Sequence, residues 1–369
     1  MATNKDGPLQ RLSALGQSVW VDFLSRESIR GGHLATLIED FAVVGATSNP
    51  TIFQKAMTAG NAYDDQIHEL AASGSDAEAT FWALAQQDVG EACDVFRASF
   101  DAGRDGYVSI EVDPRLAYDT LETYREAMRL HETLERPNLF VKIPATKPGL
   151  ASIEDVIAKG RSVNITLIFS LQRYAEVAES YLRGLERLVA EGGDPSAVAS
   201  VASFFVSRID TEADARLQKA GAEERLQGKL AIANARLAYA HYLETFSGPR
   251  WEFLASKGAT KQRVLWASTS TKNPAYPDTL YVEELIGSET INTMPEETIE
   301  AYQDHGRPEP RLQGSLDEAR RVFQEIEAAG VDYTDVTDTL EREGVEKFSQ
   351  SYDELMRALQ AKREALAVA

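Results

Sequence analysis

A lysine interrupts an apolar run that has the composition of a buried strand. Lys142 lies within residues 139–145 (LFVKIPA), between Val141 and Ile143. If both faces of this strand are covered, the ammonium must enter either the centre of the sheet or the layer of helices around it. Burial favours the neutral amine, which can attack a carbonyl carbon and form a Schiff base. The alternative is a structural lysine that pairs with a carboxylate such as Glu111.

Polar side chains also interrupt the other apolar runs, mostly toward their C-terminal halves, where parallel barrels place their active sites. These residues carry carboxylates, amides and hydroxyls: Asp22, Thr47, Asn49, Glu111, Asn164, Thr166, Ser203, Thr269 and Asn292. Asn164 and Thr166 are two residues apart and therefore face the same side of their strand. Taken singly, each residue could be a cap or a turn residue, as is typical of Asn49 before Pro50. Together they predict a site for a hydroxylated substrate around Lys142.

Other chemistries lack the residues that they need. The five histidines show no H-x-H, H-x-x-x-H or H-E-x-x-H spacing, so we predict no metal site and place each histidine at the surface or at a helix cap. These are His33, His68, His131, His241 and His305. Neither the G-x-x-x-x-G-K-[ST] nor the G-x-G-x-x-G motif is present, so we predict no nucleotide cofactor. Cys93, in a helical stretch, is expected to be a packing residue.

Eight short apolar runs are expected to form the strands that position these residues. Several runs are apolar almost throughout, as in a parallel sheet that is covered on both faces. They are residues 18–24, 41–48, 107–112, 139–145, 163–170, 201–208, 263–269 and 288–294.

The segments between the runs have helical periodicity. Apolar residues recur at i, i+3 and i+4 in residues 171–189 and 228–246, and the long connection after the second run should hold two or more helices. This alternation predicts an α/β fold, a (β/α)₈ barrel, although an open doubly wound sheet gives the same local pattern. Residues 296–303 and 317–369 are rich in Ala, Glu and Arg. We therefore expect a single barrel domain over residues 1–369, with 307–369 as a helical C-terminal extension packed on it.

Composition excludes several classes of partner. The 369 residues contain 38 Lys and Arg against 58 Asp and Glu, a formal charge of −20. So acidic a chain is repelled by nucleic acid and by anionic membranes. A single cysteine cannot form an intrachain disulfide, and residues 1–16 lack the apolar core of a signal peptide. These features predict a cytoplasmic protein.

Two segments resemble signatures of the transaldolase family. Residues 45–53 (GATSNPTIF) resemble the first, and residues 140–146 (FVKIPAT), followed by Gly149, resemble the second, which contains the Schiff-base lysine. The likeness includes residues 108–113, 164–170 and 203–208. It extends over about 12–306 and leaves the C-terminal tail outside.

The resemblance is to the longer bacterial subgroup and implies the circularly permuted (β/α)₈ barrel of a class I aldolase, with its lysine on the fourth strand. Lys142 lies on the fourth run. The implied reaction, in the non-oxidative pentose phosphate pathway, moves a dihydroxyacetone unit from sedoheptulose 7-phosphate or fructose 6-phosphate to glyceraldehyde 3-phosphate or erythrose 4-phosphate. It needs no cofactor and no metal.

Individual roles also come from the resemblance. Lys142 would form the Schiff base, Asp22 would be the general acid and base, and Glu111 with Thr166 would position a water. The resemblance places the substrate-binding residues at Thr47, Asn49, Asn164, Ser203, Phe205, Arg208 and Lys272. Among these, Asn49 and Asn164 would hold the dihydroxyacetone fragment, and Arg208 with Ser203 would bind the phosphate.

Three positions depart from the better-known subgroups of the family. Phe204 and Ser207 replace Pro and Gly, and Lys272 stands where an Arg is usual. Phe205 implies transfer, because the related fructose 6-phosphate aldolases carry a tyrosine there. The alternatives are such an aldolase and a non-catalytic sugar-phosphate-binding barrel. The sequence leaves open whether the protein is a monomer or a homodimer.

Overall fold

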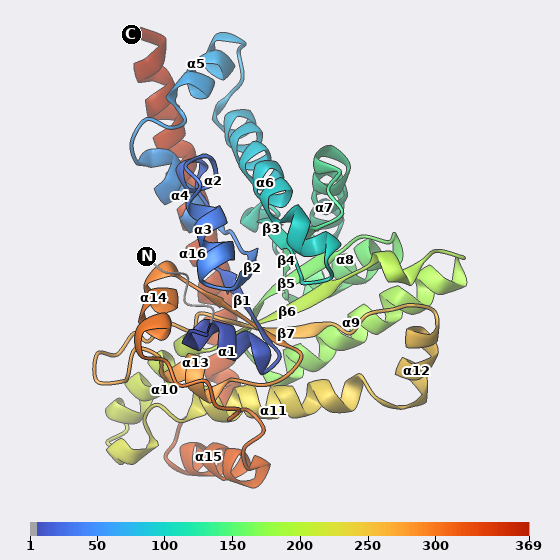
Figure 1. Ribbon diagram of the computed structural model, residues 1–369. Helices are drawn as coiled ribbons and strands as arrows, with labels where there is room; N and C mark the ends of the chain where they lie inside the picture. Colours follow the sequence, from blue (N-terminus) through green and yellow to red (C-terminus); the bar gives the residue numbers. More distant parts are fainter. Residues whose placement is uncertain (1–5, 369) are drawn as a thin grey trace.

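Eight parallel strands form a closed barrel in the computed structural model, which describes residues 6–368 (Figure 1). The strands follow one another around the barrel in chain order, and the pairing of the last strand with the first closes it. This confirms the predicted (β/α)₈ fold and excludes the open sheet. The strands are β1 (Gln17–Val21), β2 (Val43–Ala46), β3 (Tyr107–Glu111), β4 (Leu139–Pro144), β5 (Val163–Ile168), β6 (Ser200–Phe205), β7 (Arg263–Ala267) and β8 (Thr290–Met294).

Every predicted run overlaps a strand, and all residues of β4, β5 and β6 are buried. The run predicted over 201–208 is too long, because β6 ends at Phe205 and Arg208 lies in the first turn of the next helix. Val206 and Ser207 are buried at that junction. An apolar pattern cannot distinguish the end of a buried strand from the first turn of a helix that packs on the barrel.

Helices surround the barrel and connect its strands (Figure 1). They are α1 (Pro8–Ala14), α2 (Arg26–Arg30), α3 (His33–Asp40), α7 (Thr120–Leu134), α8 (Lys147–Ala158), α9 (Leu171–Ala190), α10 (Ser207–Lys219), α11 (Leu230–Thr245), α12 (Gly248–Ser256), α13 (Leu280–Glu284) and α14 (Glu296–His305), with single 3₁₀ turns at Pro114–Leu116, Pro195–Ala197 and Glu224–Leu226. The predicted helices over 171–189, 228–246 and 296–303 are confirmed as α9, α11 and α14.

The sequence of α9 explains both its start and the face that it buries. The Ser170 hydroxyl accepts a hydrogen bond from the Arg173 backbone N–H at 3.0 Å, which satisfies one of the free donors at the helix start. Tyr174, Tyr181 and Leu185 lie on the apolar stripe and are fully buried. The stripe therefore holds α9 against the barrel, as its spacing predicts.

The connection between β2 and β3 contains three helices, as predicted from its length. These are α4 (Pro50–Thr58), α5 (Asp64–Ala72) and the long α6 (Ala77–Asp101). Asp76 caps α6 by accepting a hydrogen bond from Ala79 N–H at 2.8 Å. In Figure 1 these helices extend beyond the barrel, and α6 also contacts β3.

The C-terminal extension forms α15 (Leu316–Ala328) and α16 (Tyr333–Val368). α15 packs on α11, whereas α16 passes β5 and α10 and continues along α4, α5 and α6 (Figure 1, red). The prediction of a helical C-terminal tail is confirmed. No helix within residues 6–368 combines the length and the apolar character that crossing a bilayer requires.

One histidine contradicts the prediction that all five lie at the surface or at caps. His131, on α7, is buried, and its Nε2 lies 3.0 Å from the carbonyl oxygen of Ser162. Burial lowers the pKa of His131 to about 4, because the charged imidazole would lose its hydration. The prediction failed because histidine spacing reveals metal motifs but not which helix face turns inward. Cys93, in contrast, is fully buried as predicted.

Candidate active site

A cavity of about 300 Å³ opens at the C-terminal end of the barrel. Parallel barrels place their reaction centres at this end, because the loops after all eight strands converge there. Nine of the eleven predicted site residues line it: Asp22, Thr47, Asn49, Lys142, Thr166, Ser203, Phe205, Arg208 and Lys272. The other two, Glu111 and Asn164, are buried and lie outside the lining.

The register of three strands places Lys142 between Glu111 and Asn164. Glu111 on β3 pairs with Lys142 on β4, which pairs with Asn164 on β5. Side chains at equivalent positions on neighbouring parallel strands lie on the same face of the sheet, which here is the barrel interior. The Lys142 ammonium donates a hydrogen bond to the carbonyl oxygen of Ser48 at 3.1 Å. Lys142 is 5% exposed, so the amine is buried but reaches the cavity.

Glu111 is the carboxylate nearest to this lysine. Its Oε2 lies 3.5 Å from Lys142 Nζ, and neither of its oxygens has a hydrogen-bond partner within the described residues. Burial raises the pKa of Glu111 to about 7, although the neighbouring Lys142 acts in the opposite direction. The carboxyl group can therefore accept or release a proton near neutral pH. The two alternatives for Lys142 are combined here: it is paired with Glu111 and it also faces the cavity.

Asp22 follows β1 directly and lines the same cavity. Its Oδ1 accepts a hydrogen bond from the Thr47 hydroxyl at 2.6 Å, and that hydroxyl also lies 2.7 Å from the Thr293 hydroxyl. Burial raises the pKa of Asp22, while the charge of Lys142 and the Thr47 hydrogen bond lower it. A buried carboxylate with a raised pKa is a better proton acceptor than an exposed one.

Asn49 is both a helix cap and a lining residue. Its Oδ1 accepts the backbone N–H of Ile52 at 3.0 Å, and Pro50 occupies the first position of α4. Asn49 is therefore a helix cap, which was the simpler of the two interpretations of this residue. The cap also fixes the side chain at the cavity, where its amide N–H groups can bind a substrate hydroxyl.

A short chain of hydrogen bonds connects β3, β5 and β6. Asn164 Nδ2 donates to Ser109 Oγ at 3.0 Å, and Asn164 Oδ1 accepts from Ser203 Oγ at 2.7 Å. Asn164 thereby fixes the orientation of Ser203, which lines the cavity. Thr166 is also buried at the lining, and its hydroxyl has no partner within residues 6–368.

Cations surround the mouth of the cavity in an otherwise acidic protein. Lys55, Arg208 and Lys272 line it together with Lys142, whereas Asp22 and Glu297 are its acidic residues. Burial lowers the pKa of Arg208, and burial together with the charge of Arg208 lowers the pKa of Lys272. Within the described residues neither cation forms an ion pair with a carboxylate; Lys272 Nζ donates to Ser270 Oγ at 2.7 Å. Such a cluster attracts an anion such as phosphate.

Two buried carboxylates on α10 hold the loop that carries Lys272. Asp214 accepts hydrogen bonds from the Tyr276 hydroxyl at 2.6 Å and from Gly228 N–H. Asp210 accepts from the Tyr281 hydroxyl at 2.8 Å, and burial raises its pKa to about 7. Because α10 begins beside Arg208, these bonds set the position of one cation relative to the other.

Several lining residues were not predicted: Thr51, Ile52, Lys55, Ala267, Ser268, Ser270, Thr293, Pro295, Glu297 and Phe348. Thr51, Ile52 and Lys55 follow Asn49 along one helix, so their proximity could have been inferred. Nothing in the sequence indicated that Phe348 lines the cavity, because its position depends on how α16 packs. No group of three His, Cys, Asp or Glu side chains between residues 6 and 368 could hold a metal ion.

Comparison with known proteins agrees with this geometry. The family model described as transaldolase/fructose-6-phosphate aldolase matches residues 19–359. The chain belongs to the transaldolase/fructose-6-phosphate aldolase family. The transaldolase of Saccharopolyspora erythraea is 52% identical over 360 residues, which cover 97% of this chain and 98% of the relative. That of Acidothermus cellulolyticus is 53% identical over 95% and 96% of the two chains, and that of Mycolicibacterium smegmatis is 51% identical over 99% of both.

The family match corrects the extent of the predicted resemblance. The match to the transaldolase/fructose-6-phosphate aldolase family model continues to residue 359, so it includes most of the C-terminal tail. The tail was missed because its sequence is that of an ordinary amphipathic helix without a signature motif.

Proposed function

We propose that this chain catalyses the transaldolase reaction, with Lys142 as the residue that forms the Schiff base. The observation that carries the proposal is a buried lysine whose amine reaches a cavity that also contains a carboxylate, hydroxyls and two cations, Arg208 and Lys272, without an ion-pair partner in the described part of the chain. The donor would be fructose 6-phosphate or sedoheptulose 7-phosphate. The acceptor would be erythrose 4-phosphate or glyceraldehyde 3-phosphate.

In the first step Lys142 attacks the C2 carbonyl of the donor, and loss of water gives the protonated imine. The amine must first lose a proton, and Glu111 at 3.5 Å is placed to take it. The raised pKa of Glu111, about 7, suits a group that alternates between acid and base. The Thr166 hydroxyl would help to orient the water that leaves here and returns at hydrolysis.

In the second step the protonated imine accepts the electron pair of the C3–C4 bond. Asp22 takes the proton of the C4 hydroxyl, the bond breaks, and an aldose phosphate leaves. The remaining three carbons stay on Lys142 as an enamine. The Thr47 hydroxyl, 2.6 Å from Asp22, keeps this carboxylate directed at the cavity. The enamine then attacks the acceptor aldehyde, and Asp22 returns the proton to the new hydroxyl.

Binding of the substrate is assigned to the remaining residues. Asn49 donates to hydroxyls of the dihydroxyacetone fragment, and Asn164 supports the fragment from beside Lys142 while it orients Ser203. Arg208 binds the phosphate through its guanidinium, with Lys272 as the second cation. Phe205 presents an apolar ring at the point where a hydroxyl would protonate the enamine.

We further propose that residues 1–369 form one domain, because α16 contacts both the barrel and the helices between β2 and β3. The lone buried cysteine fits a reducing compartment such as the cytoplasm. Whether the active form is a monomer or a homodimer is open to measurement by ultracentrifugation.

The test is borohydride reduction with fructose 6-phosphate and no added metal, followed by peptide mass mapping. We expect one adduct, on Lys142. Lys142→Ala should abolish both the adduct and transfer while keeping the folded circular dichroism spectrum. Lys159→Ala, which removes an exposed lysine paired with Glu191, is the matched control. An adduct on another lysine, or full activity of Lys142→Ala, would refute the mechanism.

A further inference from the structure

One apolar wall of the active-site cavity comes from the C-terminal helix. Phe348 on α16 lines the cavity and is 5% exposed. The other lining residues come from the strands, from the loops that follow them, and from α4, α10 and α14. A segment that is far away in the sequence therefore completes the reaction chamber.

Contacts on both sides of Phe348 hold this part of α16 in place. At Gly344 a Cβ atom would lie 3.0 Å from Leu167 Cδ2, so the helix approaches the end of β5 closely. Glycine is unfavourable in a helix interior, and this close approach explains its presence. One turn beyond Phe348, the Ser351 hydroxyl lies 2.9 Å from the Thr51 hydroxyl on α4. The position of Phe348 is therefore fixed from the barrel and from α4.

A second phenylalanine faces the same cavity. Phe205 is 6% exposed, and its ring centroid lies 5.1 Å from that of Phe169, which also borders Gly344. Phe205 and Phe348 offer neither O–H nor N–H groups. They are the aromatic part of a cavity whose lining is mainly polar, with Ile52, Ala267 and Pro295 as the other apolar residues.

We propose that Phe348 protects the Lys142 enamine from protonation and thereby sets the ratio of transfer to release. The inference rests on the proposed function. After C3–C4 cleavage the enamine has two fates. If its carbon attacks the acceptor aldehyde, a new C–C bond forms, and hydrolysis of the resulting imine frees the product ketose and Lys142. If the carbon instead takes a proton delivered through water, hydrolysis at C2 releases dihydroxyacetone and restores the amine.

Phe348 acts on the second fate because it occupies space that water would otherwise fill beside the reacting carbon. Replacing the ring by a methyl group opens that space. Water then gains access to the enamine before the acceptor arrives. The role is that of a positioning residue for solvent and acceptor, and Phe348 takes no part in proton transfer.

The experiment compares two rates in one preparation of the full-length enzyme. With fructose 6-phosphate as the donor, we measure dihydroxyacetone release without an acceptor and transfer to erythrose 4-phosphate. We expect Phe348→Ala to raise the ratio of release to transfer about tenfold, which corresponds to a change of about 1.4 kcal/mol in the difference between the two barriers. Phe348→Leu, which keeps an apolar side chain, should restore the ratio to near the wild-type value. The ratio does not depend on the fraction of folded enzyme.

Leu355→Ala is the matched control, because Leu355 is fully buried on the same helix but does not line the cavity. It should lower the unfolding temperature and leave the ratio unchanged. An unchanged ratio in Phe348→Ala, or an equal rise in Leu355→Ala, would overturn the inference. In either case wild-type transfer and the Lys142 adduct would leave the proposed function intact, whereas their absence would refute that function independently.

Discussion

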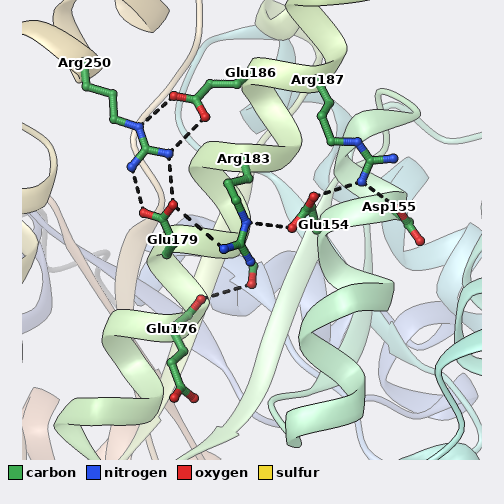
Figure 2. Close-up of polar contacts among 9 residues, drawn as sticks. Glu154, Asp155, Glu176, Glu179, Arg183, Glu186, Arg187 and Arg250 are labelled. Atoms are coloured by element: carbon green, nitrogen blue, oxygen red, sulfur yellow. Dashed lines mark hydrogen bonds and ion pairs between the residues drawn. The ribbon is translucent and has the colours of Figure 1, made fainter.

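Charged side chains are arranged in opposite ways on the outer helices and in the cavity. The arginines of α9 and α12 each have an acidic partner, and Figure 2 shows those of Arg183, Arg187 and Arg250. Arg250 bridges Glu179 and Glu186 at 2.7 Å each, and Arg187 bridges Glu154 and Asp155. These side chains are partly exposed, from 19% at Glu154 to 45% at Asp155, and form ion pairs across three helices.

In the cavity the cations lie close together instead. The charge of Arg208 lowers the pKa of Lys272 in addition to the effect of burial, and neither forms an ion pair with a carboxylate within the described residues. Like charges in proximity cost folding energy unless a ligand compensates them. The outer ion pairs compensate one another's charge. Arg208 and Lys272 form no ion pair within residues 6–368, so their positive charge stays available to an anionic ligand.

Removal of the acid–base group should have the largest effect in this comparison. Asp22→Asn preserves the shape of the residue but cannot take the C4 proton, so kcat should fall about 10²- to 10⁴-fold. Imine formation does not require Asp22, and borohydride should still trap the donor on Lys142. Loss of both trapping and turnover in a folded variant would assign Asp22 to an earlier step.

Removal of a cavity cation should weaken binding of the phosphorylated donor. Arg208→Gln loses a charge-assisted contact of about 1.5–3 kcal/mol, so KM should rise roughly 10- to 100-fold. Lys272→Gln should have a smaller effect, because a lysine lacks the fork of the guanidinium. Steady-state kinetics with fructose 6-phosphate and with unphosphorylated fructose give the KM of each variant for the two donors. Equal changes for the two donors would contradict a phosphate contact.

The pH profile tests the buried carboxyl group beside the lysine. Because the pKa of Glu111 is raised to about 7, kcat/KM should increase as the pH rises through about 7, where the carboxylate form becomes available. Glu111→Gln should be less active, by about tenfold, and should lack this increase.

The pH dependence of the free energy of unfolding is an independent test of the raised pKa of Glu111. A group with a raised pKa in the folded state contributes stability at low pH and loses that contribution as the pH rises toward its folded pKa. The free energy of unfolding of the wild type, relative to that of Glu111→Gln, should therefore decrease from pH 4.5 toward about 7. Urea titrations at several pH values measure it, and a constant difference would show that burial does not perturb Glu111.

Removal of an outer cation should have the smallest effect. Arg250→Gln breaks the bridge between Glu179 and Glu186, but exposed ion pairs contribute only about 0–1 kcal/mol each and are screened by salt. Urea unfolding should show a loss of about 1 kcal/mol or less that shrinks at high salt, with unchanged kcat and KM. A change in KM like that of Arg208→Gln would remove the distinction between the two regions.

The sequence predicted the eight strands and most of the candidate site. The alternation of apolar runs with helices allowed either a barrel or an open sheet, and the resemblance to transaldolases favoured the barrel, in which every strand ends on one side. Local order therefore implied that Asp22, Lys142 and Arg208 would converge. The strand that was predicted too long, at 201–208, shows the limit of the pattern, because burial continues into the first turn of α10.

Only the tertiary structure decided which distant segments meet. The burial of His131 and the arrival of Phe348 at the cavity depend on how whole helices pack. The sequence offered the pair of Glu111 and Lys142 as one of two alternatives, and the structure shows it at 3.5 Å in a lysine that also lines the cavity. Periodicity determines which face of a helix is apolar, but not which surface that face will meet. α16 has the composition of an ordinary amphipathic helix, and only its path beside β5 and along α4 makes it a wall of the active site.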